Sequence, residues 1–69
     1  MKKSIADQIR DLENTRAAKA ARLEEVTQKS IDDERSMDEA EAEEFDTLEG
    51  DIKSIDADLA RLVRLQTVM

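Results

Sequence analysis

Residues 45–62, FDTLEGDIKSIDADLARL, determine the fold that we expect. Apolar side chains recur in this stretch at alternating steps of three and four positions, at Phe45, Leu48, Ile52, Ile55, Leu59 and Leu62. An α-helix completes a turn every 3.6 residues, so this spacing places all six on one face. Val63 and Leu65 widen the apolar stripe near its end. The stretch therefore predicts an amphipathic helix over about residues 38–66.

A second apolar stripe runs through the N-terminal half of the chain. Its members are Ile5, Ile9, Leu12, Leu23 and Val26, and Arg16 and Lys19 take the two positions in its middle. Two interpretations of this polar middle stay open. The two side chains are partly buried and select a register or a partner, or they extend past a narrow seam into water, which is the commoner case. No proline or glycine interrupts the stretch, so we expect a helix over about residues 3–33.

Between the two stripes lies SIDDERSMD, residues 30–38, where the periodicity fails and polar residues gather. We expect the chain to turn at about residues 34–37. Two capping boxes compete to start the following helix, Ser36 with Glu39 and Asp38 with Glu41. Either one places several carboxylates in the first two helical turns, where the helix dipole favours negative charge.

These elements predict an all-α fold, an antiparallel two-helix hairpin of the coiled-coil type, with residues 1–69 as a single domain. A chain of 69 residues buries only about 60% of the surface that its unfolded form exposes, so it is only marginally stable alone. It has no cysteine and no histidine, so disulfides and the usual structural metal sites do not stabilise it. We therefore expect the eleven apolar residues of the two stripes to form an association seam, with oligomerisation completing a helical bundle.

The net charge of −7 is concentrated around the predicted turn. Residues 31–51 hold eleven acidic groups and one basic group, net −10, whereas residues 1–30 carry +2 and residues 52–69 carry +1. An antiparallel hairpin would thus be acidic at its turn and basic at its open end, which holds Lys2, Lys3, Arg61 and Arg64. Two hairpins associating head to tail would match opposite charges, whereas a parallel cluster would bring the acidic turns together.

The acidic run around the turn does not have the pattern of a chemical site. An EF-hand needs alternating acidic ligands before its glycine, and Gly50, the single glycine, lacks them. Without histidine there is no Ser-His nucleophile, and one glycine cannot build a phosphate-binding loop. We expect no enzyme activity, no metal and no cofactor. The negative net charge argues against a nucleic-acid partner, and no apolar run is long enough to span a membrane.

Residues 35–62, RSMDEAEAEEFDTLEGDIKSIDADLARL, resemble the N-terminal region of major capsid proteins of tailed phages of the Hong Kong 97 type. The opening residues 1–18, MKKSIADQIRDLENTRAA, and the Leu-Glu-Glu at residues 23–25 are also similar to that family. The most specific part is Phe45-Asp46 followed by Leu48, placed just after a capped turn. Glu34 departs from the family, in which a turn glycine is common at this position.

The resemblance implies a scaffolding, or delta, domain. Such a domain is helical and non-catalytic, lies inside the procapsid assembled in the host cytoplasm, and promotes correct assembly of the capsid subunits. Its partners are other copies of itself and the capsid protein body, and the phage maturation protease later removes it. Two other roles stay open, a free-standing coiled-coil adaptor or regulator that docks on a protein partner, and a helical arm of a larger enzyme.

Overall fold

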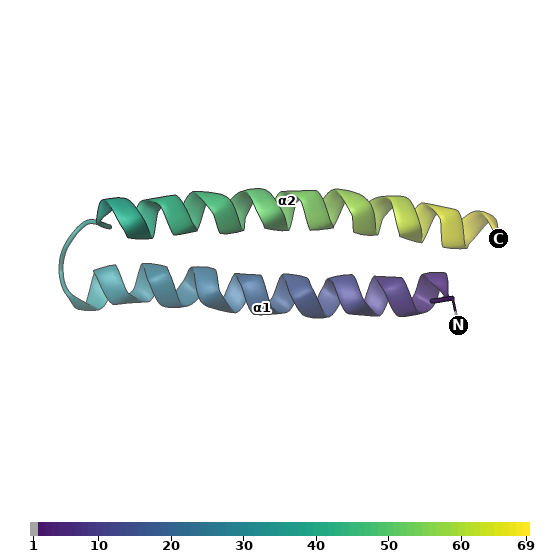
Figure 1. The fold of residues 1–69 in the computed structure, drawn as a ribbon, viewed down its shortest axis with the longest axis horizontal. Helices are drawn as coiled ribbons and strands as arrows, with labels where there is room; N and C mark the ends of the chain where they lie inside the picture. The colour runs from purple at the N-terminus through teal and green to yellow at the C-terminus, as the bar shows by residue number, and fades with distance from the viewer. Residues whose placement is uncertain (1) are drawn as a thin grey trace.

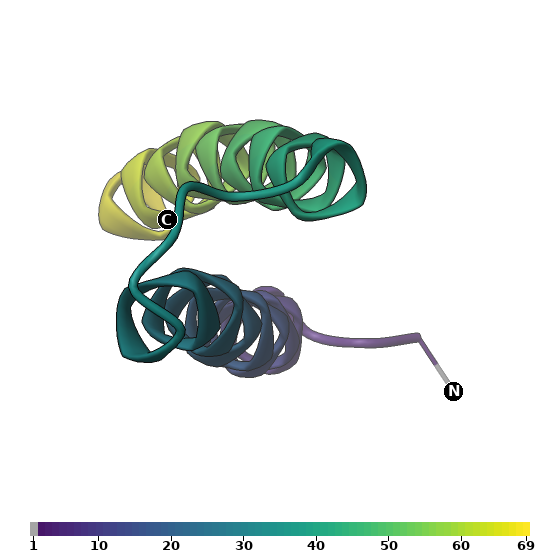
Figure 2. The same ribbon diagram turned by 90° about the vertical axis from the view of Figure 1, so that its left-hand side faces the viewer.

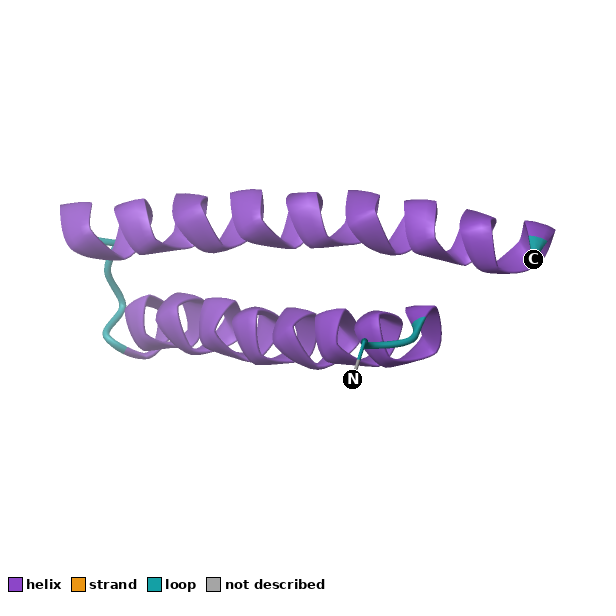
Figure 3. Cartoon of the chain, turned by 45° about the vertical axis from the view of Figure 1, so that its right-hand side comes forward, coloured by secondary structure: helices purple, strands orange, loops and turns teal. Residues whose placement is uncertain are grey.

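The computed structural model describes residues 2–69 and contains two long helices (Figure 1). Helix α1 spans Ile5–Asp32 with 28 residues, and helix α2 spans Glu39–Val68 with 30 residues. They run antiparallel and lie side by side, giving principal dimensions of 50 × 18 × 17 Å. The other described residues form turns and loops (Figure 3), so the predicted all-α antiparallel hairpin is confirmed.

Ser4 is the N-cap of α1. Its hydroxyl accepts a hydrogen bond from the Asp7 amide at 3.0 Å, and the Asp7 carboxylate accepts one from the Ser4 amide at 3.5 Å. This capping box satisfies amides that the start of a helix leaves without intrahelical partners. Helix α1 therefore begins at Ile5, two residues after the predicted start, and the Ser4-x-x-Asp7 spacing is the sequence signal for this boundary.

Asp38 starts α2 in the same way. Its Oδ1 accepts a hydrogen bond from the Glu41 amide at 2.8 Å, and the Glu41 carboxylate accepts one from the Asp38 amide at 3.0 Å. Of the two candidate capping boxes, only this one forms; Ser36 stays in the exposed loop, and Glu39 is the first helical residue. The physical reason lies at Arg35, which binds the Ser36 carbonyl and the Glu41 carboxylate and so holds this part of the loop outside the helix.

Helix α1 ends in a Schellman motif. The Glu34 amide donates to the Ile31 carbonyl at 3.0 Å, and the Arg35 amide donates to the Ser30 carbonyl at 3.1 Å. This pair of hydrogen bonds requires a left-handed backbone conformation at Glu34, whose φ is 51°. Glycine usually takes such a place, because a Cβ atom is strained in the left-handed region. The resulting loop covers residues 33–38, against the predicted 34–37.

The two helices lie side by side (Figure 2), and the core is one thin layer of side chains between them. Its buried apolar residues are Val26, Leu48 and Ile55, which are 4%, 8% and 9% exposed. Ser30, one turn after Val26, is also buried and donates its hydroxyl hydrogen to the Thr27 carbonyl at 2.9 Å. No described side chain is fully enclosed, because two helices form one layer and cannot surround it.

The C-terminal end of α2 extends past the start of α1 (Figure 1). Val68 and Met69 are 80% and 84% exposed there. Further back in the helix, Val63 and Leu65 are 48% and 46% exposed, so they do not add to the buried stripe. The hairpin thus leaves large apolar side chains in water along the last turns of α2.

Candidate functional site

The predicted association seam is the interface between the two helices of the hairpin. None of its eleven apolar residues is exposed: Val26, Leu48 and Ile55 are buried, and the rest are half-buried, namely Ile5, Ile9, Leu12, Leu23, Phe45, Ile52, Leu59 and Leu62. The seam therefore packs within one chain, but eight of its eleven residues keep partial contact with water. Any further association of the closed hairpin must use its flanks.

Ser30 belongs to the same interface, although it is a polar residue. It lies four residues after Val26, so it continues the alternation of three and four steps. Its hydrogen bond to the Thr27 carbonyl satisfies the hydroxyl when it is buried. The spacing alone was a sufficient signal for its position.

Three ion pairs join α1 to α2 along the interface. Arg16 donates to both carboxylate oxygens of Asp56, with the Nη2–Oδ2 bond at 3.1 Å. Lys19 Nζ lies 3.0 Å from Asp51 Oδ2. Arg22 binds Glu44 through two bonds of 2.6 and 2.9 Å. In every pair α1 supplies the cation and α2 the carboxylate.

This arrangement corrects the commoner interpretation of the polar middle of the α1 stripe. Arg16 and Lys19 do not extend freely into water; each reaches across to a carboxylate on the other helix. The Lys19 side chain is only 32% exposed. Each cation has a partner 32 or 40 positions away on the other helix, so the pairs form in the observed register and favour it.

The arginine hydrogen bonds stabilise the charged forms of their partners. The Arg16 guanidinium lowers the pKa of Asp56, first through its hydrogen bond and then through its charge. Arg22 lowers the pKa of Glu44 in the same way, against an opposing effect of partial desolvation. Both carboxylates therefore stay ionised over the whole neutral range.

A fourth ion pair fixes the turn to the start of α2. Arg35 donates to both carboxylate oxygens of Glu41, at 2.5 and 3.1 Å, and the Glu41 side chain is only 14% exposed. The Arg35 hydrogen bond, followed by the bond from the Asp38 amide, lowers the pKa of Glu41 to about 2. One carboxylate thus serves both as a member of the capping box and as an anchor for the loop.

The two flanks of the hairpin differ in chemistry, and heptad spacing distinguishes them on α2. Glu44, Asp51, Asp58 and Leu65 recur every seven residues, which is close to two helical turns, and two of them bind cations of α1. We call this flank the ion-pair face. Asp56 and Val63, also seven apart, lie on the opposite flank, which we call the Val63 face.

On α1, successive side chains advance by 100° around the helix axis, so the sequence position of a residue shows on which of the two faces it lies. The Val63 face mixes small, apolar and charged residues. Its small and apolar members are Ala6, Ala17, Ala20, Thr27 and Ile31 of α1, with Ala42, Phe45, Ala60 and Val63 of α2. Its charged members are Arg10, Glu13, Glu24, Asp46, Glu49, Lys53 and Asp56. Ile31 and Val63 are 59% and 48% exposed, so the apolar part of this face is in contact with water.

A shallow open groove of about 450 Å³ lies on the ion-pair face. It is lined by Asn14, Thr15, Ala18, Lys19, Arg22 and Leu48. Lys19 and Arg22 already bind carboxylates of α2 across this groove, so their charges are satisfied within the chain. The arrangement is that of a helix interface with a charged border.

The hairpin exposes more surface than a compact chain of its mass. Its accessible surface is 5301 Å², whereas a compact monomer of 7.8 kDa exposes about 4,400 Å². The excess, about 900 Å², is similar to the roughly 800 Å² that each partner buries in a standard protein interface. One chain therefore has surface available for a stable interface.

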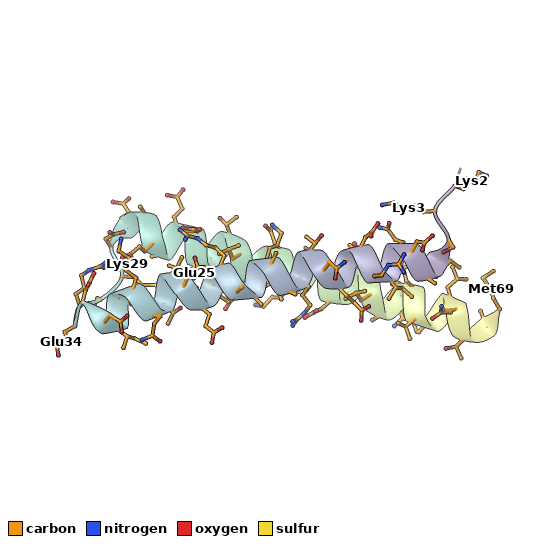
Figure 4. The ribbon with its side chains drawn as sticks, turned by 90° about the horizontal axis from the view of Figure 1, so that it is seen from below. Lys2, Lys3, Glu25, Lys29, Glu34 and Met69 are labelled. Carbon is orange, nitrogen blue, oxygen red and sulfur yellow. The ribbon has the colours of Figure 1, made fainter. Side chains whose placement is uncertain are left out.

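The two ends of the hairpin carry opposite charges (Figure 4). Lys2 and Lys3 lie at the open end, and Glu34 lies at the tip of the turn. Within residues 2–69, no ion pair forms at the turn-end carboxylates of Glu34, Glu39, Glu43 and Asp46, and none forms at Lys2 or Arg64 of the open end. Both ends thus keep charge available for a partner.

The described residues bring together no set of three or more potential metal ligands of the His, Cys, Asp or Glu type. In the same part of the chain, neither helix has an apolar stretch of the length needed to cross a bilayer. Comparison of the sequence with protein-family models, with curated proteins and with solved structures gave no match.

Proposed function

We propose that this chain is a scaffolding domain of a tailed-phage major capsid protein of the Hong Kong 97 type. It promotes procapsid assembly by helical self-association, and the maturation protease later removes it. The observation that carries the proposal is the incomplete core of the hairpin. Only three apolar side chains are buried, while about 900 Å² of surface exceeds what a compact chain exposes. Such a hairpin gains most of its remaining stability by association.

The resemblance to the capsid family supports this role at the level of individual residues. Its most specific feature is Phe45-Asp46 with Leu48, following a capped turn. Asp38 caps the helix after the turn, Phe45 is half-buried and Leu48 is buried in the interface. The residues that carry the resemblance are therefore those that build the turn and the core of the hairpin.

The chemistry of the surface is compatible with a temporary, non-catalytic part of a capsid. A domain of net charge −7 does not hold DNA by phosphate contacts, so it would not compete for the genome. A thin hairpin core allows local opening near the helix ends, which gives a protease access. The proposed partners are other copies of the chain, the capsid protein body and, as the processing enzyme, the maturation protease.

The test is procapsid assembly by the complete reading frame that contains these residues, expressed without the protease and observed by electron microscopy. We expect closed shells from the intact frame and none, or aberrant particles, when residues 1–69 are deleted. Leu48→Asp introduces a charge into the interface and should reduce shell formation. Its matched control, Leu65→Asp, changes an exposed residue and should not.

Equal assembly with and without residues 1–69 would contradict the scaffolding role. A reading frame with no capsid body would favour the coiled-coil adaptor instead. In that case, affinity purification with wild-type and Leu48→Asp chains would identify a protein partner that depends on the folded hairpin.

A further inference from the structure

We propose that the hairpin opens at residues 33–38 and that two copies exchange α2, forming an antiparallel dimer in which each chain is one continuous helix. The proposal rests on the self-association proposed above and names its interface, which is the seam already present between α1 and α2. In the dimer, α1 of each copy packs on α2 of the other, and a two-fold axis passes through the former loop. Outside residues 33–38, the dimer uses the same contacts between α1 and α2 as the hairpin.

The two apolar stripes are in phase with one another across the loop. Ser30 of α1 and Leu48 of α2 are both buried, and they lie 18 residues apart, which is about five complete turns of an α-helix. If residues 33–38 continued the helix, all eleven seam residues would therefore lie within a sector of about 100° on one face. A hairpin requires its stripes to face each other after the turn, but a continuous helix that pairs along its whole length requires this common phase.

The loop has a sequence that can continue the helix. Residues 33–38, DERSMD, contain neither proline nor glycine. Met37 lies seven residues after Ser30, about two helical turns, so in a continuous helix it would lie on the face of the seam. It is half-buried beside the turn in the hairpin. Opening therefore adds the one large apolar side chain of the loop to the seam.

The turn of the hairpin is strained at a position that a helix would relax. Glu34 has a φ of 51°, and its Cβ atom makes this left-handed conformation unfavourable. In the continuous helix Glu34 takes the ordinary right-handed conformation. A short loop under strain favours the exchange of identical elements between two copies.

The ion pairs between the helices fit a two-fold axis through the loop. Counted along the chain, the midpoint between Arg16 and Asp56 is residue 36, and the midpoint between Lys19 and Asp51 is residue 35. Both midpoints lie within residues 33–38. An axis there places each cation of one copy beside the same carboxylate of the other copy, so the pairs form again between the chains.

Other contacts of the turn hold the hairpin closed. The Asp38 capping box, the ion pair of Arg35 with Glu41 and the Schellman hydrogen bonds exist only while the chain turns. Opening removes them, and it brings the acidic segments of two copies, residues 31–51 with net −10 each, together at the axis. The hairpin is therefore favoured at low protein concentration and low ionic strength, and the exchanged dimer at high protein concentration and high ionic strength.

The response to salt distinguishes this dimer from a dimer of closed hairpins. Closed hairpins that associate head to tail attract each other through opposite charges, so salt should weaken them. The exchanged dimer brings like charges together, so salt should lower its Kd. Sedimentation equilibrium across ionic strength measures the sign. A Kd that rises with salt overturns the exchange.

A distance within one chain provides the direct test. Spin labels on Ala17→Cys and Ser54→Cys occupy exposed positions of the two helices, in a chain that has no other cysteine. The labelled chain is refolded from urea with an excess of unlabelled chain, so that each dimer contains at most one labelled copy. A continuous helix separates the labels by about 56 Å. In the hairpin, whose helices pack about 8–10 Å apart, the labels lie within about 30 Å.

The long distance should appear and grow as the concentration of total protein and of salt increases. A dimer that shows only the short distance overturns the proposal, and so does a chain that stays monomeric at its highest soluble concentration.

A glycine variant tests whether the turn controls the exchange. Glu34→Gly removes the strain from the hairpin and lowers the helix propensity of the hinge. Because a dimer contains two hinges, the Kd should rise about hundredfold or more. The matched control is Ala57→Gly, at an exposed position that is helical in both forms, and it should leave the Kd unchanged. Circular dichroism verifies that both variants stay helical. An equal rise of the Kd in both variants, or no rise in Glu34→Gly, overturns the proposal.

These results separate the exchange from the function on which it rests. A dimer of closed hairpins refutes the exchange but leaves self-association and scaffolding intact. An exchanged dimer, in a chain whose deletion does not affect shell assembly, supports the exchange and refutes the capsid role.

Discussion

Arg16 and Asp56, forty positions apart in the chain, are joined by two hydrogen bonds across the hairpin. Arg16 occupies a place in the α1 stripe where the pattern predicts an apolar residue, and the carboxylate that receives it comes from the opposite helix. The pair forms in the observed register and therefore adds to the apolar stripes in favouring this alignment of the two helices.

A charge reversal tests this relationship. Arg16→Asp should destabilise the hairpin because it places two carboxylates together, and Asp56→Arg should destabilise it by placing two guanidinium groups together. The double variant restores an opposite pair and should be more stable than the sum of the single effects predicts. Urea unfolding followed by circular dichroism measures all four chains. Additive losses would show that the two residues do not interact.

The start of α2 gives a second prediction. Asp38→Ala removes the side-chain acceptor for the Glu41 amide and should lower the free energy of unfolding by about 1 kcal/mol. Ser36→Ala, the change at the other candidate cap, should cost less than about 0.5 kcal/mol because Ser36 lies in the exposed loop. Thermal unfolding of the two variants measures the difference. A larger loss of stability for Ser36→Ala would show that Ser36, and not Asp38, caps α2.

The pKa of Glu41 predicts a pH dependence. Its folded value of about 2 lies below the ordinary value of 4.5, so the unfolded chain takes up the proton first as the pH falls. The stabilisation from this group is therefore complete above about pH 4.5 and is lost as the pH approaches 2. Other carboxylates titrate in the same range, so the measurement must isolate Glu41.

The comparison with Glu41→Gln isolates it. Glutamine keeps an acceptor for the Asp38 amide but cannot pair with Arg35. The urea midpoint of the wild type should exceed that of the variant by a constant amount between pH 7 and pH 5, and the difference should disappear near pH 2. Glu39→Gln, a neighbour without an ion pair in the described chain, is the control. A difference that does not depend on pH would exclude the ion pair as its source.

The single glycine of the chain lies where it lowers stability. Gly50 is in the interior of α2, and a Cβ atom there would meet nothing within 4 Å. Gly50→Ala should raise the free energy of unfolding by about 1 kcal/mol, because glycine has the greater freedom to lose in a helix. Ala57→Gly, at another exposed position of α2, should lower it by a similar amount. A loss of stability in Gly50→Ala would indicate that this position needs the smaller residue.

The left-handed residue of the turn gives the converse prediction. Glu34 has a φ of 51°, and glycine adopts this conformation without strain. Glu34→Gly should therefore stabilise the hairpin by about 1 kcal/mol. Glu34→Ala removes the same charge but keeps the Cβ atom, so it separates strain from electrostatics. An equal gain from both variants would assign the effect to the acidic charge of the turn.

The sequence was sufficient to predict the two helices and the apolar face of each. Alternating steps of three and four placed all eleven seam residues, from Ile5 to Leu62, at the helix interface, because the period of the helix depends only on backbone geometry. It also placed the turn within one residue at each end. These features are local, so nearby residues are enough to determine them.

The choice between the two capping boxes at the start of α2 could not be made from neighbouring residues alone. Ser36 and Asp38 both offer a capping box, and the side chain that decides between them is Arg35, which binds Glu41 once the chain has turned. The α1 cap at Ser4 is different, because Ser4 and Asp7 form a complete capping box within four consecutive residues.

The sequence by itself determined two amphipathic helices, a turn between them and an acidic pole at that turn. Only the tertiary structure decided that Arg16, Lys19 and Arg22 each meet a carboxylate of α2, and that the two apolar stripes of one chain pack against each other with most of their residues only half-buried. The physical reason is that a pattern along one helix fixes which side chains share a face. Which residues of another helix they meet depends on register and rotation, which exist only after the two helices have packed.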